Sequence, residues 1–522
     1  MPFRSTTTPS GTARRWRPLT TGVLSLALGA ALAVTALAPP GVRPGPRPTS
    51  LPVAESPVQF LGGGKAGWGG TDPAYTPSQI ADVIHARSLW SAGYRGQGID
   101  VAVIDTGVVP VAGLAGKTVN GPDLSFERGN DTLRSLDTFG HGTHMASLIA
   151  GTADATDAKG APVAGTWSGI APASRVISLK VATADGAADV SQVIAGINWV
   201  VEHRRDPGLN IRVLNLSFGT NSAQSYLLDP LAHAVEQAWK AGIVVVAAAG
   251  NDGATATRLD DPAIDPLVLA VGAESPGTDP AVKHDTVADF SSRGSTTRHA
   301  DLLAPGASVL GLRDPGSAID LAYPSAVVGE RFFKGSGTSQ AAAVTSGAVA
   351  LLLSKRPTLT PDQVKKLLTS TAAPIDGADA VSQGAGVLDV NKAAGASIPA
   401  LSTQLAVATG LGSLEAARGG AHVQLGSTEL TGEKDAFGAA WKPAIWTAAI
   451  TGLTSWTGSA APSGTSWSTW AWLGSSLADK TTTQTTTSSG GWTGRMWSGR
   501  MWSGGTWSAT LWTGRMWSST LW

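Results

Sequence analysis

A glycine-rich turn, Gly335-Ser-Gly-Thr-Ser339, runs directly into an alanine-rich stretch that predicts a helix. We therefore expect Ser339 at the start of that helix, beside unpaired backbone N–H groups and the positive end of the helix dipole. A hydroxyl in this place suits nucleophilic chemistry, because those groups stabilise a developing oxyanion. The segment by itself also fits an ordinary helix N-cap, since serine is a preferred capping residue.

Three more polar side chains stand where predicted elements begin or end. Asp105 follows the apolar run of residues 99–104, and Asn251 follows the apolar run of residues 243–248. Open α/β sheets build their sites at the carboxyl ends of such strands. His141 begins a predicted helix, and His144 lies three residues further on, where we interpret it as a packed or capping side chain. Each of these residues alone also fits a turn or a cap.

Together the four residues could perform acyl transfer. A serine hydroxyl needs a base that takes its proton, and the base needs an anionic partner that sets its tautomer. The oxyanion that then forms needs hydrogen-bond donors aimed at it. The chain order Asp, His, Ser is the order found in subtilisin.

Short apolar runs alternate with helical patterns through this part of the chain, which predicts a mostly parallel sheet with helices on both faces, an α/β fold. A capping box at Thr360 and Gln363 predicts a helix over residues 360–371, and residues 384–390 are interpreted as a closing strand. The other expected strands are 99–104, 175–181, 213–217, 243–248 and 268–271, and the other expected helices are 190–203 and 227–240.

On these motifs, residues 87–396 resemble the subtilisin-like serine peptidases. The resemblance implies that Ser339 is the nucleophile, His141 the general base and Asp105 the residue that orients the imidazole. It further implies that Asn251 donates to the oxyanion together with the backbone N–H of Ser339. Chemically, these roles meet the requirements of acyl transfer stated above.

The resemblance also indicates where substrate binds. Two segments would wall an apolar pocket for the primary side chain, and an extended substrate would add a strand to one of them. The first segment is Ser217, Phe218 and Gly219, and the second is Ala248, Ala249 and Gly250.

The chain departs from the family in three places. The nucleophile helix continues Ser339-Gln-Ala-Ala-Ala-Val344, which changes the packing behind the serine but removes no catalytic atom. The segment before residue 87 is short and unlike a folded pro-domain. No acidic cluster resembles a calcium loop clearly enough to name ligands, so a structural calcium ion stays open and no cofactor is assigned. Asp123, Asp131 and Asp137 are weak candidates that we interpret as solvated loop charges.

Composition excludes several other classes of protein. The 38 basic and 38 acidic residues cancel, so nothing in the charge favours a nucleic-acid partner. The absence of cysteine excludes a disulfide framework, a zinc–thiolate site and a cysteine nucleophile.

Both ends of the chain differ from the central region. Four arginines precede the uncharged run of residues 22–38, which predicts a signal peptide over residues 1–36. A membrane anchor is the alternative, because the run approaches the length of a spanning helix. The proline- and glycine-rich residues 37–86 would form a linker or a pro-segment. We therefore expect a secreted or cell-surface protein.

Residues 397–440 are predicted to be a linker or small accessory segment, and residues 441–522 an irregular or repeat-built, tryptophan-rich region. Tryptophan recurs every five residues from Trp492 to Trp522. Such residues suit attachment to wall glycan, to a membrane interface or to other copies of the chain, and a low-complexity tail without a single partner is the alternative.

The leading hypothesis is a secreted serine endopeptidase that acts on protein or peptide substrates through an acyl-enzyme. One alternative is a ligase with the same fold, which passes the acyl group to an amine. The other is a catalytically weak or inactive surface-binding protein.

Overall fold

The computed structural model describes residues 67–68, 74–277, 281–398, 400, 406–420, 422–425, 428–436 and 438–451. All of them belong to the unit formed by residues 59–522. The predicted signal peptide, residues 1–36, and the tryptophan repeat from Trp492 to Trp522 lie outside the described residues.

The central sheet has the order β3-β4-β2-β5-β6-β7-β8, with β9 paired to β7. All of its pairings are parallel except that of β7 with β8. Its inner strands are continuous runs of buried residues, as expected for a sheet covered on both faces. The strands are β2 (Asp100–Asp105), β3 (Thr118–Asp123), β4 (Arg175–Lys180), β5 (Ile211–Leu216), β6 (Val244–Ala248), β7 (Leu269–Ser275), β8 (Thr286–Val287) and β9 (Leu302–Pro305).

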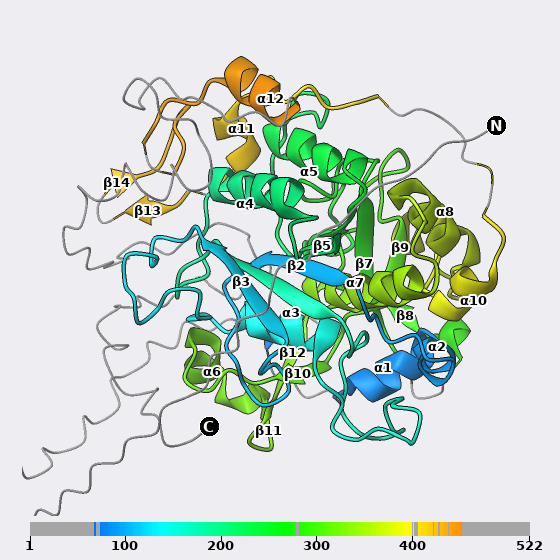
Figure 1. The fold of residues 1–522 in the computed structure, drawn as a ribbon. Coiled ribbons are helices and arrows are strands. Elements are labelled where there is room, and N and C mark those ends of the chain that lie inside the picture. Colours follow the sequence, from blue (N-terminus) through cyan, green and yellow to red (C-terminus); the bar gives the residue numbers. More distant parts are fainter. Residues whose placement is uncertain are drawn as a thin grey trace, which may run out of the picture. The chain divides into compact units, whose positions relative to one another are not determined.

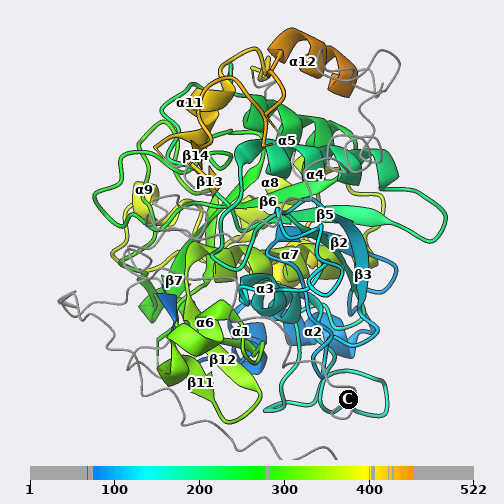
Figure 2. The same ribbon diagram turned by 90° about the vertical axis from the view of Figure 1, so that its left-hand side faces the viewer.

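Two pairs of helices cover this sheet (Figure 1). Helices α3 (His141–Ala150) and α7 (Thr338–Lys355) pack together on one face, and α4 (Val190–His203) and α5 (Pro230–Lys240) pack together on the other (Figure 2). The predicted α/β class, a mostly parallel sheet with helices on both faces, is confirmed.

A small antiparallel sheet positions the turn that precedes α7. It consists of β1 (Gly67–Trp68), β10 (Val309–Leu312), β11 (Val327–Val328) and β12 (Phe332–Ser336), and β12 pairs with each of the others. Because β12 ends only two residues before α7 begins, this sheet fixes where the chain enters the helix.

The local signals located most elements well. Helix α8 (Pro361–Thr371) begins with the predicted capping box, in which Thr360 and Gln363 bond each other's backbone. The predicted strand over residues 384–390 is wrong. Gly384 and Gly386 have φ values of +59° and +108°, which break an extended chain, and Val387 makes only isolated bridges.

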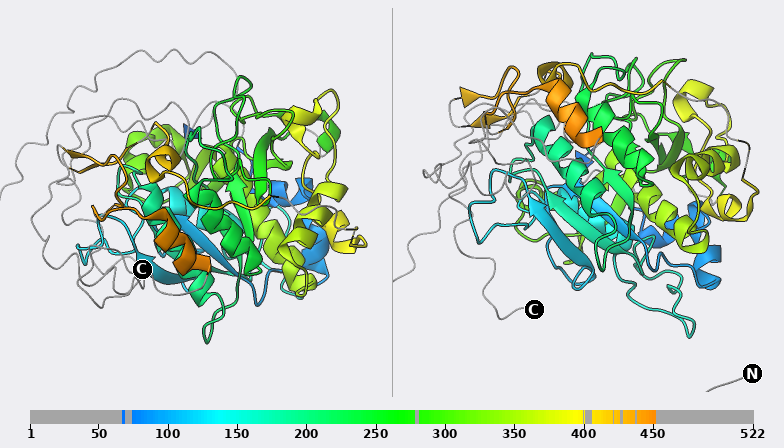
Figure 3. Two further views of the ribbon diagram at one scale, coloured as in Figure 1. Left: turned by 90° about the horizontal axis from the view of Figure 1, so that it is seen from above. Right: turned by 45° about the horizontal axis from the view of Figure 1, so that its top comes forward.

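Segments outside the predicted catalytic region also pack into its core (Figure 3). Helix α1 (Pro77–Val83) contributes Ile80, and residues 406–451 contribute Leu414 and Trp446, all of them fully buried. The predicted boundaries at residues 87 and 397 therefore do not mark the edges of this core. The remaining elements are α2 (Ala86–Ser91), η1 (Val282–His284), α6 (Ala318–Ala322), η2 (Pro324–Ala326), α9 (Ala380–Gln383), α10 (Val390–Gly395), α11 (Leu414–Arg418), β13 (Gln424–Leu425), β14 (Thr428–Glu429) and α12 (Pro443–Thr451).

Within the described ranges, none of the helices has the length and apolar character that crossing a membrane requires.

Candidate active site

Asp105 and His141 form a buried pair. Asp105 is the last residue of β2 and His141 is the first of α3. The His141 Nδ1 atom lies 3.0 and 3.1 Å from the two carboxylate oxygens, and the side chains are only 1% and 2% exposed. A carboxylate at Nδ1 holds the proton on that nitrogen and leaves Nε2 as the basic atom of the ring.

Close backbone packing allows this approach. A Cβ atom at Gly142 would lie 2.1 Å from the carbonyl oxygen of Gly107 and 3.0 Å from Asp105 Oδ1. Only glycine fits there, so the His-Gly dipeptide is a steric requirement for bringing α3 against the end of β2.

Thr106 and Asp137 tie the start of α3 to the end of β2. The Thr106 hydroxyl donates to Asp137 Oδ1 at 2.7 Å and accepts from the backbone N–H of Gly142 at 2.8 Å. Asp137 also accepts from the N–H groups of Gly140, at 2.6 Å, and Thr143, at 2.7 Å. These bonds satisfy donors at the helix N-terminus and hold His141 in place.

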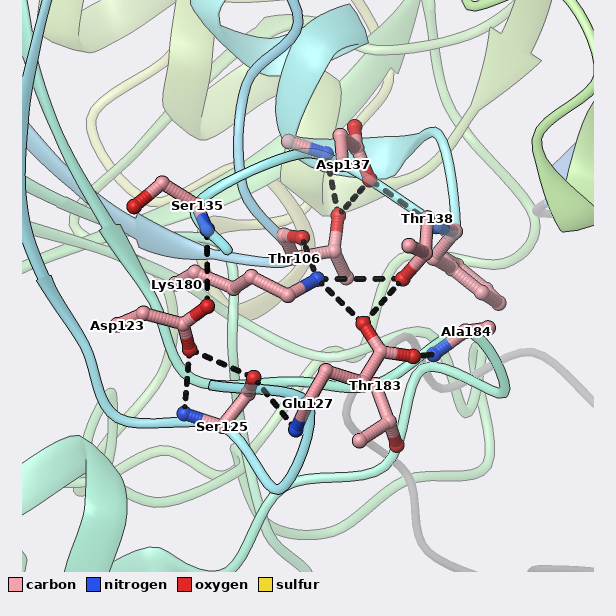
Figure 4. A network of polar contacts seen from close by, with 12 residues as sticks. Thr106, Asp123, Ser125, Glu127, Ser135, Asp137, Thr138, Lys180, Thr183 and Ala184 are labelled. Carbon is pink, nitrogen blue, oxygen red and sulfur yellow. Dashed lines mark hydrogen bonds and ion pairs between the residues drawn. The ribbon is translucent and has the colours of Figure 1, made fainter. Parts of the chain in front are cut away.

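A fully buried lysine supports the same turn from below (Figure 4). Lys180 Nζ donates to the carbonyl oxygen of Thr106 at 2.8 Å and forms an ion pair with Glu127 at 3.0 Å. Burial alone would lower the pKa of Lys180, but Glu127, Asp123 and Asp137 together raise it. The ammonium therefore stays charged and fixes Thr106, the neighbour of Asp105.

The three weak calcium candidates have other partners. Asp137 anchors α3, and buried Asp123 accepts from the N–H groups of Ser125 and Ser135 at 2.9 Å each, so the interpretation of both as solvated loop charges is wrong (Figure 4). Asp131 is exposed and pairs with Arg134, as expected. The described residues contain no group of three or more metal-ligating side chains.

Ser339 is the second residue of α7, as predicted. Its Oγ atom lies 3.5 Å from the carbonyl oxygen of Ser217, and the Ser217 hydroxyl donates to the carbonyl oxygen of Ser339 at 3.1 Å. The nucleophile candidate and the first predicted wall segment are therefore in direct contact.

Asn251 is tied to the residue before Ser339. Its Oδ1 atom accepts from the backbone N–H of Thr338 at 2.8 Å and from the Thr338 hydroxyl at 3.0 Å. A backbone N–H can only donate, so these bonds identify the oxygen of the amide and leave its NH₂ group as the donor end. The amide nitrogen lies 3.6 Å from the Cβ position of Gly337, in the turn before the helix.

The two predicted wall segments follow neighbouring strands. Residues 217–219 follow β5, and residues 248–250 begin at the last residue of β6, which pairs with β5 in parallel. Gly250 N–H donates to the Thr338 hydroxyl at 3.2 Å, which brings the second segment to the start of α7. Ser217, Phe218, Gly219, Ala248, Ala249 and Gly250 are all buried.

His144 is a structural residue, as interpreted from the sequence. It is completely buried, and its Nε2 atom lies 3.0 Å from the carbonyl oxygen of Phe333. Burial first, and then the neighbouring His141, lower its pKa to about 3. The ring of Trp68 packs edge-on against both histidines, with its centroid 5.9 Å from that of His141 and 5.2 Å from that of His144.

The sequence patterns did not single out the supporting residues Thr106, Lys180 and Trp68, and they predicted a different role for Asp137. Thr106 follows the predicted aspartate directly and Asp137 precedes the predicted histidine by four residues, so their positions were informative. Lys180 and Trp68 had no comparable local signal, because the residues that they contact lie in distant segments of the chain.

The central region of the chain is similar to known proteins. A family model described as "Subtilase family" matches residues 96–396. The chain is 37% identical to serine protease AprX of Bacillus subtilis over 292 residues, which cover 54% of this chain and 64% of AprX. It is 32% identical to subtilisin DY of Bacillus licheniformis over 314 residues, which cover 60% of this chain and 96% of that protein.

Proposed function

This chain belongs to the subtilase family, and we propose that it is a secreted serine endopeptidase that hydrolyses peptide bonds through an acyl-enzyme. The buried pair of Asp105 and His141, held at 3.0 Å on elements that pack beside the helix bearing Ser339, is the observation that carries the proposal. A surface-binding protein without activity has no need of a buried carboxylate–imidazole pair.

The proposed reaction follows from these positions. Ser339 Oγ attacks the substrate carbonyl carbon while its proton passes to His141 Nε2, and Asp105 stabilises the imidazolium that forms. The carbonyl oxygen becomes an oxyanion, which accepts from the Asn251 amide and the backbone N–H of Ser339. His141 then gives the proton to the leaving amine, and the C–N bond breaks. Water, deprotonated by the same histidine, then attacks the acyl carbonyl carbon; the ester bond to Ser339 Oγ breaks, and the histidine returns its proton to that oxygen.

Residues 217–219 and 248–250 are proposed to bind the substrate on either side of Ser339. Ser217 contacts Ser339 directly, and Gly250 contacts Thr338, the residue before Ser339, which supports this role. An extended substrate would then pair with exposed backbone, so that protein and peptide substrates of varied sequence are accepted.

Export is proposed from the charged and apolar residues at the N-terminus, and one of the relatives is named a minor extracellular protease, from Bacillus subtilis. The tryptophan repeat is proposed to attach the protein to wall glycan, to a membrane interface or to other copies. These two features concern location and attachment, and the chemistry does not depend on them.

A serine-directed phosphonate tests the proposal directly. We expect one adduct, mapped by mass spectrometry to Ser339, and we expect the Ser339→Ala variant to lose both labelling and peptide hydrolysis. Labelling of another serine, or undiminished hydrolysis by the variant, contradicts the assignment. Addition of an amine nucleophile separates a hydrolase from a ligase, because a ligase forms mainly the amide product.

A further inference from the structure

Asp260 lies between the two segments that flank Ser339. Its backbone N–H donates to the carbonyl oxygen of Ala249 at 3.1 Å. The next residue, Asp261, exchanges two hydrogen bonds of 2.9 Å each with Thr220. Residues 260–261 therefore connect the chain that follows β5 to the chain that ends β6, and they close the space between these segments at one end.

The Asp260 side chain points at the glycine of each segment. A Cβ atom at Gly219 would lie 2.6 Å from Asp260 Cβ and 3.2 Å from its Oδ2 atom. A Cβ atom at Gly250 would lie 2.8 Å from both Cγ and Oδ2. The carboxyl group thus occupies the space that side chains at these two positions would otherwise fill.

Both glycines are close to the proposed nucleophile along the chain. Gly219 follows Ser217, whose carbonyl oxygen lies 3.5 Å from Ser339 Oγ, by two residues. Gly250 donates to Thr338, the residue before Ser339. A substrate residue whose carbonyl carbon reaches Ser339 therefore has its side chain next to the space that Asp260 closes.

We infer that Asp260 selects lysine or arginine on the acyl side of the bond that is cleaved. This inference rests on the proposed peptidase function and names its preferred substrate. Buried Phe218 and Ala248 offer apolar surface for the methylene stem of such a side chain, and the carboxylate receives its charged head. The pocket predicted from the sequence was apolar throughout, so Asp260 changes the expected specificity.

The space beside Asp260 is polar on its other side as well. Ser292 adds a hydroxyl near the Gly250 wall, 2.9 Å from the Cβ position of that glycine. An acidic side chain would meet like charge here, which adds discrimination against glutamate and aspartate.

The test uses peptides that differ only in the residue before the cleaved bond: arginine, lysine, glutamine, leucine, phenylalanine or glutamate. For the wild-type protein we expect kcat/KM for arginine and lysine to exceed that for leucine and glutamine by about 10-fold or more. Asp260→Asn should lower kcat/KM for the two basic peptides by about 10- to 100-fold, the range of one hydrogen bond to a charged group, and change the leucine value by less than about threefold.

Asp289→Asn is the matched control. Asp289 is exposed, lies in the same region and has its backbone oxygen beside Gly253. The substitution removes one negative charge without touching Gly219 or Gly250. The basic preference should persist in this variant, and its loss would assign the effect to general surface charge and overturn the inference.

Three checks guard against a misfolded variant. The phosphonate label counts the competent sites in each preparation, and Asp260→Ser provides a smaller neutral side chain at the same place. Inhibition of the wild-type protein by peptide aldehydes that end in arginine or leucine needs no variant, and the arginine compound should bind more tightly.

Preference of the labelled wild-type protein for leucine or phenylalanine would overturn the role of Asp260 and leave the peptidase proposal intact. Absence of both labelling and hydrolysis with every peptide would instead overturn the proposed function itself.

Discussion

Removal of the Thr106 hydroxyl should weaken both the fold and the catalytic pair. Thr106→Val keeps the volume of the side chain but deletes the group that joins Asp137 to the backbone N–H of Gly142. Asp105 and His141 lie directly beside these residues, so a loss of this link should displace the histidine relative to the carboxylate.

The magnitude follows from the two bonds. A buried N–H left without its acceptor costs about 1 to 3 kcal/mol, and a hydrogen bond to a charged group contributes about 1.5 to 3 kcal/mol. Asp137 still accepts from the N–H groups of Gly140 and Thr143, so the loss of its hydrogen bond from Thr106 costs an amount at the lower end of the range for bonds to a charged group. We expect the free energy of unfolding to fall by about 2 to 4 kcal/mol in Thr106→Val and by less than about 1 kcal/mol in Thr106→Ser, which keeps the hydroxyl.

Urea unfolding of both variants in a Ser339→Ala background measures the free energy without self-digestion. In the active background, kcat/KM per phosphonate-labelled site should fall by about 10-fold or more in Thr106→Val and recover in Thr106→Ser, since small displacements of catalytic groups reduce rates strongly. Equal losses in the two variants would show that packing of the methyl group matters and that the hydroxyl does not.

Three further changes probe other parts of the molecule. Asn251→Ala should lower kcat by about 10² to 10³ with little change in KM; this magnitude is the one known for the equivalent donor in subtilisin and is not worked out from this structure. A change confined to KM would instead make Asn251 a pocket residue. Burial raises the pKa of Asp265 from 3.8 to about 7, so the stability that its protonated form contributes is full below pH 3.8 and is lost as the pH rises to 7. The unfolding free energy of Asp265→Asn relative to that of the wild type should therefore rise by up to about 4 kcal/mol between pH 4 and pH 8. A difference in urea unfolding that stays constant with pH would contradict the shift. A chain that ends at Thr451 should keep its hydrolytic activity. A chain that ends at residue 405 should unfold at a lower temperature, because it loses buried Arg418 and the 2.6 Å ion pair of Arg418 with Asp189. Equal melting temperatures of the two chains would show that residues 406–451 do not stabilise the core.

The sequence alone determined the residues with catalytic potential and the class of fold. Asp105, His141, Asn251 and Ser339 each stand at the end of an apolar run or at the start of a helix, and these local patterns are set by neighbouring residues. Strands buried on both faces and a capping box are equally local signals, which is why the α/β class and helix α8 were predicted correctly.

The strand predicted over residues 384–390 is absent because its conformation depends on contacts outside the segment. Apolar residues around Val387 suit a strand, but the positive φ values of Gly384 and Gly386 depend on close backbone contacts with residues 300–301 and 373–374. No pattern within the segment itself reports those contacts.

Only the tertiary structure decided what surrounds the four residues. Asp137 is a helix anchor because Thr106, 31 positions earlier, folds against it, and buried Lys180, the last residue of β4, pairs with Glu127 from the segment between β3 and α3. Asp260 packs against Gly219 and Gly250, which follow two different strands and leave room because they carry no side chain. Such contacts join positions far apart in the chain and obey no periodic pattern, so they arise only when the sheet brings its strand ends together.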